Sequence, residues 1–286
     1  MKLNKATEKF LLDCKVRTSK ETYEYELSKC RMLNLFIGDY NTKRIDRDII
    51  NEYIVAHREY NPKISNTSLN KGVATLKRVV KYADNRTIEY KKLKEGRKLT
   101  PTIPINTKKI IFDYLESQKH RSRGFRNLLF FRLLDDTGLR LKEIRHLRIR
   151  NLDISNNSFV ATTTKTDTDR IVYYSDYVKD LIIEYIETFD ITDYLFINFK
   201  TSEIITTNSV ENVAKRIKQK LKIPFSISPH KWRHTFANEF SKNVNDLESL
   251  RIILGHTKIT TTQRYLHHDN DYIKAQYMKS NDRRIR

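Results

Sequence analysis

The sequence predicts a mainly α-helical fold with one small three-stranded antiparallel sheet in its second half. The residues that interrupt helices are scarce, with only 6 Gly and 5 Pro among 286 residues. Apolar residues recur at helical spacing through most of the chain, whereas β-branched and aromatic residues gather at 158–175. This length suffices for one large domain or two smaller ones, each with its own core.

The first hundred residues are predicted to form helices. A helix at 20–37 would begin with Thr18 and Glu21, which have the spacing of a capping box. Shorter helices at 4–15 and 46–58 complete the predicted bundle. Five apolar residues step by four, three, four and three and so share one face of a further helix: Leu69, Val73, Leu76, Val80 and Ala83.

The segment KKLKEGRKLTPTIP, at 91–104, breaks the helical pattern. It contains Gly96, Pro101 and Pro104, and its basic residues repel one another unless an anion lies nearby. We therefore expect a basic linker at 93–104, between a helical domain at 1–92 and a second domain at 105–286.

The second domain is predicted to begin with helices at 106–119 and 124–137. The runs SFVATTT and RIVYYS then have the composition of strands, and the polar KTDTD between them suggests a hairpin. A turn at Asn156-Asn157 would add a third strand. Further helices are expected at 175–189, 206–222, 229–242, 245–254, 258–267 and 270–280.

The charge of the chain points to a polyanionic partner. The formal net charge is +20, and nucleic acid is the commonest partner of so basic a protein. Residues 1–104 carry 23 basic and 13 acidic side chains, and residues 105–286 carry 32 and 22, so the excess is shared equally. A solvated basic surface is the alternative, but we favour a protein that holds double-stranded DNA from two sides, with the first helices as a clamp.

Cysteine usage and hydropathy suggest a cytoplasmic protein. Cys14 and Cys30 are the only cysteines, and buried free thiols are favoured over a disulfide. No apolar run approaches the length of a membrane span, and the N-terminus MKLNKATEKF lacks the apolar core of a signal peptide.

Six residues in fixed order form a constellation suited to phosphodiester chemistry. An arginine fork can bridge two phosphate oxygens, and histidine or lysine can transfer protons. A tyrosine hydroxyl can attack phosphorus when its surroundings are strongly positive. For Lys165, in the predicted hairpin, the alternative is an ordinary solvated lysine in a turn. The six candidates are Arg140, Lys165, His230, Arg233, His256 and Tyr265.

The motifs around these residues resemble the successive signature boxes of the tyrosine recombinase (phage integrase) family. They are TGLRLKEIRHL, the hairpin lysine, PHKWRHTFA, LGH and TTTQRYLHH, in unbroken order over roughly 105–267. The resemblance implies a helical core-type DNA-binding domain at 1–92. It also implies an α+β catalytic domain at 105–286, with a C-terminal helix or tail at about 268–286.

The resemblance also implies a role for each candidate. Arg140 and Arg233 would bind the scissile phosphate. Lys165 would be the general acid toward the 5′ hydroxyl, and His230 would act as acid or base. His256 would hydrogen-bond a phosphate oxygen, and Tyr265 would form the 3′-phosphotyrosine.

Three further positions match the family without an expected catalytic role. Glu143 is expected to support the site, Arg170 occupies a commonly basic position after the hairpin, and His234 is expected to be structural. The turn KTDTDR departs from the family because it carries two aspartates, which leaves the reach of Lys165 open.

The resulting expectation is a site-specific recombinase that needs no metal and no nucleotide cofactor. Its partners would be double-stranded DNA recombination sites and other copies of itself in a synaptic tetramer, with the tail docked on a neighbour or packed on its own domain. It would serve integration and excision, or resolution, of a mobile or extrachromosomal element. A type IB topoisomerase and a non-catalytic DNA-binding protein of the same fold are the alternatives.

Overall fold

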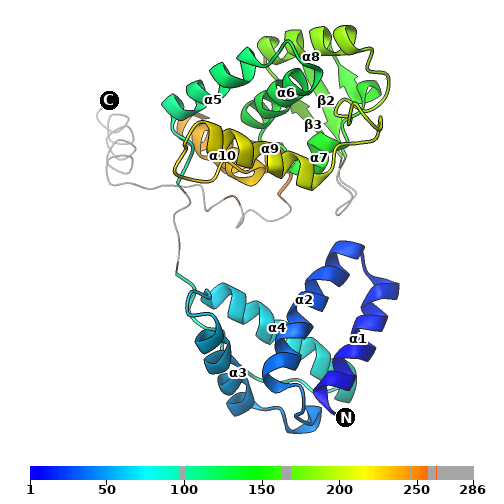
Figure 1. The fold of residues 1–286 in the computed structure, drawn as a ribbon, viewed down its shortest axis with the longest axis vertical. Helices are drawn as coiled ribbons and strands as arrows, with labels where there is room; N and C mark the ends of the chain where they lie inside the picture. Colours follow the sequence, from blue (N-terminus) through cyan, green and yellow to red (C-terminus); the bar gives the residue numbers. More distant parts are fainter. Residues whose placement is uncertain (97–100, 163–168, 245, 257–261, 263–286) are drawn as a thin grey trace, which may run out of the picture. The chain divides into compact units, whose positions relative to one another are not determined.

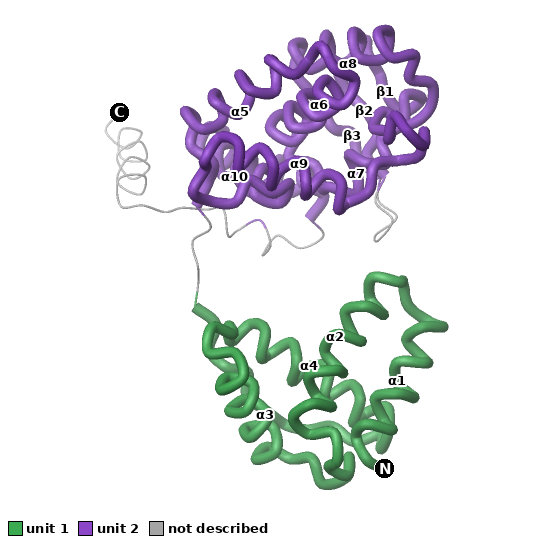
Figure 2. The backbone as a smooth tube through the Cα atoms, in the orientation of Figure 1, with its two compact units in different colours: residues 1–98 green, residues 99–286 purple. Residues whose placement is uncertain are grey.

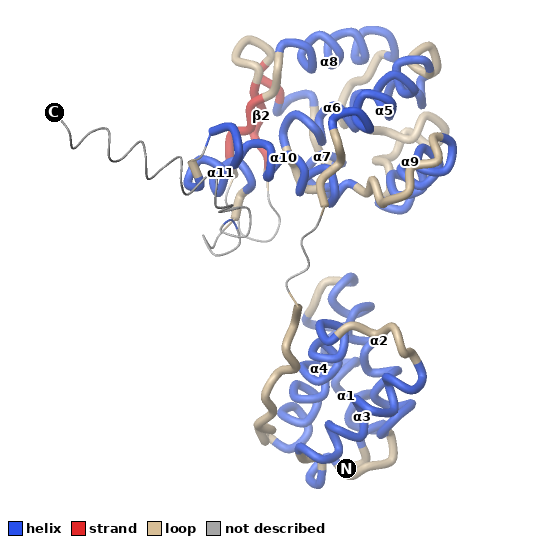
Figure 3. The backbone as a smooth tube through the Cα atoms, turned by 90° about the vertical axis from the view of Figure 1, so that its left-hand side faces the viewer, coloured by secondary structure: helices blue, strands red, loops and turns tan. Residues whose placement is uncertain are grey.

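The computed structural model describes residues 1–96, 101–162, 169–244, 246–256 and 262. The chain divides into two compact units, Met1–Lys98 and Leu99–Arg286 (Figure 2). Helices predominate in both units, and the three-stranded antiparallel sheet lies in the second (Figure 3). The predicted fold class is confirmed.

The first unit is a bundle of helices (Figure 1). Its elements are α1 (Leu3–Arg17), α2 (Lys20–Ile37), the short 3₁₀ helix η1 (Thr42–Arg44), α3 (Arg47–Tyr60) and α4 (Asn66–Asp84). Helices α1, α2 and α4 pack against one another, and each of the four predicted helices is present.

The apolar face predicted for α4 lies in the core of this unit. Leu69, Leu76 and Val80 have no exposed surface, and Ala83 packs at the edge of the same cluster. Burial of such faces is the main source of helix stability in a bundle of this size.

The start of α2 differs from the prediction. Ser19 is the N-cap, and its Oγ accepts a hydrogen bond from the backbone N–H of Thr22 at 3.3 Å. The hydroxyl of Thr18 instead donates to the carbonyl of Cys14 at 2.7 Å, which satisfies a carbonyl at the end of α1. The predicted capping box of Thr18 and Glu21 is therefore wrong, because the threonine side chain is used by the preceding helix.

Both described ends of the predicted linker are hydrogen-bonded to a unit. Asn70 of α4 accepts from the backbone N–H of Leu93 at 2.9 Å and donates to the carboxylate of Glu95 at 2.8 Å. At the other end, the backbone N–H of Ile103 donates to Thr235 Oγ1 at 3.0 Å, and Ile103 is buried in the core of the second unit.

Cys14 and Cys30 are buried free thiols, as predicted. Burial raises the pKa of both, and it raises the pKa of Cys30 to about 12. Both thiols therefore remain protonated at neutral pH.

The second unit has a core of helices with the sheet at one side (Figure 1). Its helices are α5 (Ile105–Ser117), α6 (Ser122–Thr137), α7 (Leu141–Arg145), α8 (Asp176–Phe189), α9 (Thr207–Lys220), α10 (Pro229–Val244) and α11 (Leu247–Leu254), with the 3₁₀ helix η2 at Ile149–Asn151. Of the helices predicted at 258–267 and 270–280, only residue 262 lies within the described residues.

The sheet has the order β1–β2–β3, with both pairs antiparallel. Strand β1 (Leu152–Asp153) pairs with β2 (Ser158–Ala161) across the predicted turn, and β2 pairs with β3 (Arg170–Tyr173). The registers place Val160 opposite Ile171 and Ala161 opposite Arg170. Arg170 therefore begins the strand that follows the predicted hairpin turn.

Helix α6 is the centre of this unit and packs against α5, α8 and α10. Its Phe131 contacts Trp232 of α10, with ring centroids 5.8 Å apart, and neither side chain is more than 1% exposed. Lys108 of α5 adds a buried polar connection, since its Nζ lies 2.5 Å from Asp135 Oδ1 of α6 and 2.6 Å from Glu239 Oε2 of α10. These contacts fix α10, the helix that carries two of the candidate residues.

Within the described part of the chain, none of the helices combines the length and the apolar character needed to cross a membrane.

Candidate active site

Arg140 is placed by a sharp turn at the end of α6. Gly138 ends this helix with φ +59°, a conformation that favours glycine, and a Cβ there would lie 2.3 Å from the ring of Phe236. Arg140 follows as the N-cap of α7. Its side chain is 39% exposed, so the guanidinium is accessible from solvent.

Arg233 lies one turn after His230 on α10, because the two residues are three positions apart in one helix. His230 is exposed in the first turn, whereas Arg233 is only 5% exposed. Arg233 Nη1 donates to the carbonyl of Gly138 at 2.8 Å, which ties α10 to the turn that holds Arg140. A phosphate can reach this guanidinium only if the groups that cover it move.

His256 directly follows the end of α11. The helix ends at Gly255 with φ +61°, and the next residue turns inward and is buried. His256 Nε2 lies 3.0 Å from Arg233 Nη2, and its Nδ1 lies 2.9 Å from the hydroxyl of Thr262. The imidazole is therefore held between an arginine and a threonine.

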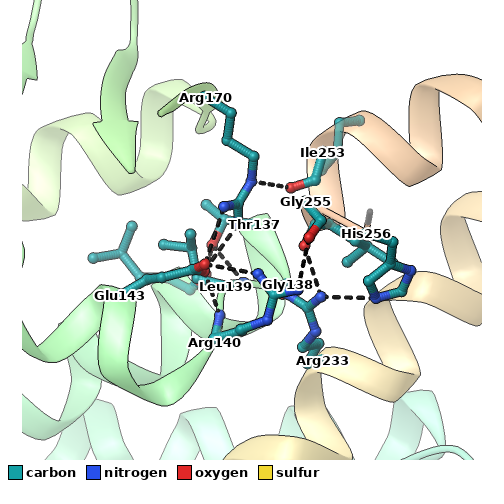
Figure 4. Close-up of polar contacts among 12 residues, drawn as sticks. Thr137, Gly138, Leu139, Arg140, Glu143, Arg170, Arg233, Ile253, Gly255 and His256 are labelled. Atoms are coloured by element: carbon teal, nitrogen blue, oxygen red, sulfur yellow. Dashed lines mark hydrogen bonds and ion pairs between the residues drawn. The ribbon is translucent and has the colours of Figure 1, made fainter. Parts of the chain in front are cut away.

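Arginine side chains bind consecutive carbonyls at the end of α11 (Figure 4). Arg170 Nε donates to Ile253 at 2.8 Å, Arg233 Nη2 to Leu254 at 2.7 Å and Arg140 Nη2 to Gly255 at 2.7 Å. The last carbonyls of a helix lack intrahelical donors and carry its partial negative charge, so cations are favoured there. Three arginines, from β3, α10 and the N-cap of α7, are thus gathered at one helix end.

Glu143 joins two of these arginines. Its Oε1 accepts from Arg140 Nη1 at 2.9 Å and from Arg170 Nη1 at 3.0 Å. Its Oε2 accepts from the backbone N–H of Arg140 and from Arg170 Nη2, each at 2.8 Å. Burial raises the pKa of Glu143, but the hydrogen bonds and charges of the two arginines outweigh this and hold it below its ordinary value.

The arrangement concentrates positive charge beside one buried carboxylate. Three guanidiniums and Glu143 together carry a net charge of about +2, because arginine stays protonated at any relevant pH. Such a group of fixed donors suits an anion whose charge increases during reaction. His230 and His256 add two imidazoles, which can transfer or share protons near neutral pH.

The structure thus brings Arg140, Arg233 and His256 together, although they are far apart in sequence (Figure 4). His230 is on the same helix as Arg233. Lys165 and Tyr265 lie outside the described residues, so their predicted places remain predictions.

Sequence reasoning did not find the contacts made by Arg170 and Thr262. The sequence indicates only a basic position at Arg170, and it does not distinguish Thr262 from its neighbours. Their sequence signal is weak, since one is an arginine in a very basic chain and the other lies in a run of threonines. Their partners, Glu143 and His256, are set by the tertiary fold.

Comparison with known proteins gives a consistent result. A model described as "Phage integrase family" matches residues 106–271. A probable integrase/recombinase of Acholeplasma phage L2 is 27% identical over 221 residues, covering 74% of this chain and 76% of the phage protein. The tyrosine recombinase XerC of Staphylococcus saprophyticus is 25% identical over 236 residues, which is 78% of each chain.

The fold is also that of a solved structure. The integrase of the Tn1549 transposon, in complex with transposon right end DNA, has a TM-score of 0.80. The match covers 98% of this chain and 100% of the integrase chain at 16% sequence identity, a likeness that concerns the fold alone.

Proposed function

Because the chain belongs to the phage integrase family of tyrosine recombinases, enzymes that break and rejoin DNA strands, we propose that it recombines specific DNA sites through a covalent 3′-phosphotyrosyl intermediate. The observation that carries this proposal is the convergence of Arg140, Arg233 and His256 at the end of α11. These groups come from three separate elements and suit one phosphodiester.

In the proposed reaction, the hydroxyl oxygen of Tyr265 attacks the scissile phosphorus. The new bond joins tyrosine to the 3′ phosphate, and the bond from phosphorus to the 5′ oxygen breaks. Lys165 gives the departing 5′ oxygen its proton, and His230 acts as acid or base for the tyrosine proton. A 5′ hydroxyl from the partner strand then reverses these steps, so the phosphodiester forms again without ATP.

Arg140 and Arg233 would stabilise the charge that gathers on the phosphate oxygens in the transition state. Arg140 is accessible, whereas Arg233 is covered and bonded to the carbonyls of Gly138 and Leu254. We infer that binding of DNA uncovers Arg233 and exchanges at least one of these bonds for a phosphate oxygen. His256 would then donate a hydrogen bond to the same phosphate.

The proposed partner is double-stranded DNA. The net charge of +20 supports it, as does the exposed basic face of α9, with Lys215, Arg216 and Lys220. The basic residues of the first unit support the same partner, and we propose this unit as the core-type DNA-binding domain.

The proposed biological role is integration and excision, or resolution, of a mobile or extrachromosomal element. Recombination joins four DNA arms, so we also propose a synaptic tetramer in which the tail at 268–286 docks on a neighbouring copy. Truncation after His268 should leave binding to a single arm nearly intact and weaken cooperative binding to a two-arm site. A gel-shift titration with unchanged cooperativity would confine the tail to its own subunit.

The proposed function is tested on a supercoiled plasmid that carries two copies of the native site. This site is sought in the DNA that flanks the gene. Recombinant circles support site-specific recombination. Relaxation without exchange would instead indicate a type IB topoisomerase, and retardation of DNA without a covalent complex would indicate a non-catalytic binding protein.

A further inference from the structure

Arg170 has no role in the proposed reaction, yet it makes contacts on two sides of the site (Figure 4). Its Nη1 and Nη2 donate to the two oxygens of Glu143 at 3.0 and 2.8 Å. Its Nε donates to the carbonyl of Ile253 at 2.8 Å. The side chain is only 8% exposed, so it is part of the interior of the unit.

The space for this guanidinium depends on Gly255. A Cβ on Gly255 would lie 2.8 Å from Arg170 Nη1 and 3.0 Å from its Cζ. The guanidinium therefore packs directly on the backbone that precedes His256. This close approach fixes the end of α11 relative to β3.

The charges explain what this contact does for Arg140. The side chain of Glu143 is 3% exposed. Its carboxylate accepts hydrogen bonds from both the backbone N–H and the guanidinium of Arg140. Without a second cation, this carboxylate would cancel the charge of Arg140 at close range, since water screens a buried pair poorly. Arg170 supplies that second cation, because its three guanidinium nitrogens donate to the carboxylate of Glu143 and to the carbonyl of Ile253.

We propose that Arg170 is a positioning residue that neutralises Glu143, so that Arg140 keeps its full positive charge and its orientation toward the scissile phosphate. This inference rests on the proposed function, because it takes Arg140 as a phosphate ligand. Arg170 acts through Glu143 and does not touch the reacting atoms.

A pH dependence follows from the same contacts. Burial raises the pKa of Glu143, while the hydrogen bond and charge of Arg170 lower it more than those of any other group. Without Arg170, the carboxyl should take up a proton closer to neutral pH. Protonation removes its negative charge, so cleavage by an Arg170→Met variant should recover as the pH falls and worsen as it rises.

Charged groups on the neighbouring elements are bonded elsewhere. On α6, Asp135 pairs with Lys108, and Asp136 accepts from the backbone of Ser175. On α11, Arg251 pairs with Glu248. On α10, Arg233 bonds the carbonyls of Gly138 and Leu254 and the ring of His256, as described above. Arg140 and Arg170 are thus the cations that bond the Glu143 carboxylate within the described residues.

The test uses a double-mutant cycle in the full-length protein, with Arg170→Met, Glu143→Gln and the two combined. Single-turnover formation of the covalent adduct is followed on a nicked suicide substrate, and binding is followed by gel shift. We expect Arg170→Met to slow adduct formation about 100-fold while binding changes less than about threefold, as for loss of a transition-state interaction. The double variant Arg170→Met/Glu143→Gln should form the adduct about tenfold faster than Arg170→Met alone, as expected for residues coupled in one network.

Arg126→Met is the matched control. Arg126 is also buried in the second unit, at 6% exposed, but its guanidinium donates to the carbonyl of Ile197 and to Asn127, not to an acidic side chain. A merely structural role for Arg170 predicts that both variants lose stability and activity in parallel, with no rescue by Glu143→Gln and no shift in the pH profile. That result would overturn the proposal.

Arg170→Lys covers the case in which Arg170→Met does not fold, because it keeps the charge beside Glu143. The proposal then predicts near-normal binding and a cleavage rate within about tenfold of the wild type. A loss as large as that of Arg140→Ala would contradict it. Wild-type protein that forms no adduct on the same substrate would instead refute the proposed function itself.

Discussion

Arg233 Nη2 and His256 Nε2 lie 3.0 Å apart and join α10 to the residue that follows α11. A guanidinium has no acceptor, so the imidazole nitrogen accepts at this contact. The other nitrogen, Nδ1, then carries the proton and donates to Thr262 at 2.9 Å. His256 is thus neutral in this arrangement, and it must gain a proton on Nε2 before that atom can donate to a phosphate.

The tautomer of His256 is therefore a testable property of the DNA-free protein. We expect long-range ¹H–¹⁵N spectra of histidine-labelled protein to show the Nδ1–H form, with His256→Gln used for assignment. Thr262→Val removes the acceptor, so it should increase the fraction of the other tautomer. An Nε2–H form in the free wild type would contradict the proposed direction of the Arg233–His256 hydrogen bond.

Lys165→Ala should slow cleavage by about 10²–10⁴-fold if this lysine is the general acid. A DNA substrate with sulfur at the 5′-bridging position has a leaving group that needs no proton, so it should largely rescue the variant. The matched comparison is Arg233→Ala, whose defect lies in charge stabilisation and should persist on the sulfur substrate. Equal rescue of both variants, or of neither, would remove Lys165 from the acid role.

Lys108→Met should destabilise the second unit by about 3–5 kcal/mol, because it leaves Asp135 without its buried partner. Burial already raises the pKa of Asp135, which is the expected effect of a costly buried charge. Urea denaturation can be followed by the fluorescence of Trp232, the single tryptophan of the chain. The exposed neighbour Lys109→Met is the control, and equal destabilisation by the two changes would contradict the role of this contact.

Cys30 should make the first unit sensitive to alkaline pH. Its pKa is raised from 9.0 to about 12 in the fold, so the folded state holds the thiol proton more tightly than the unfolded chain. This contribution to stability is complete below the ordinary thiol pKa and is lost as the pH rises from about 9 toward about 12.

Urea denaturation followed by circular dichroism at pH 8 and pH 10 measures this effect. Between pH 8 and pH 10, the free energy of unfolding of the wild type should fall by roughly 1.4 kcal/mol more than that of Cys30→Ala. This is the value for one proton over one pH unit. Each protein is compared with itself at the two pH values, so the free-energy cost of the cavity left by alanine cancels. Parallel losses in the two proteins would show that the thiol does not titrate on unfolding.

Periodic features of the sequence predicted most of the fold. The α4 face at 69–83 and the antiparallel strands of the hairpin were predictable because helical and strand periodicities repeat over several residues. The start of α2 was not, since Thr18 and Ser19 are both capping residues and only the packed structure decides which helix each one serves. Local signals of equal strength cannot be separated without tertiary contacts.

The candidate site was predictable in composition but not in its contacts. The spacing of His230 and Arg233 indicates one helical face, yet it contains no information on the burial of Arg233. The Arg170–Glu143 pair joins residues 27 positions apart, which lie on β3 and α7 and meet only in the folded protein. Such pairings are products of the fold, and a single sequence does not specify them.

In the proposed reaction, Tyr265 forms the covalent bond to DNA. Wild-type protein incubated with a nicked suicide substrate should form an adduct that survives denaturing electrophoresis, and peptide mapping should place the DNA on Tyr265. Tyr265→Phe removes only the attacking oxygen, so binding should persist while the adduct disappears, and Tyr272→Phe and Tyr277→Phe should still form it. An adduct trapped with Tyr265→Phe would contradict the account and place the nucleophile elsewhere.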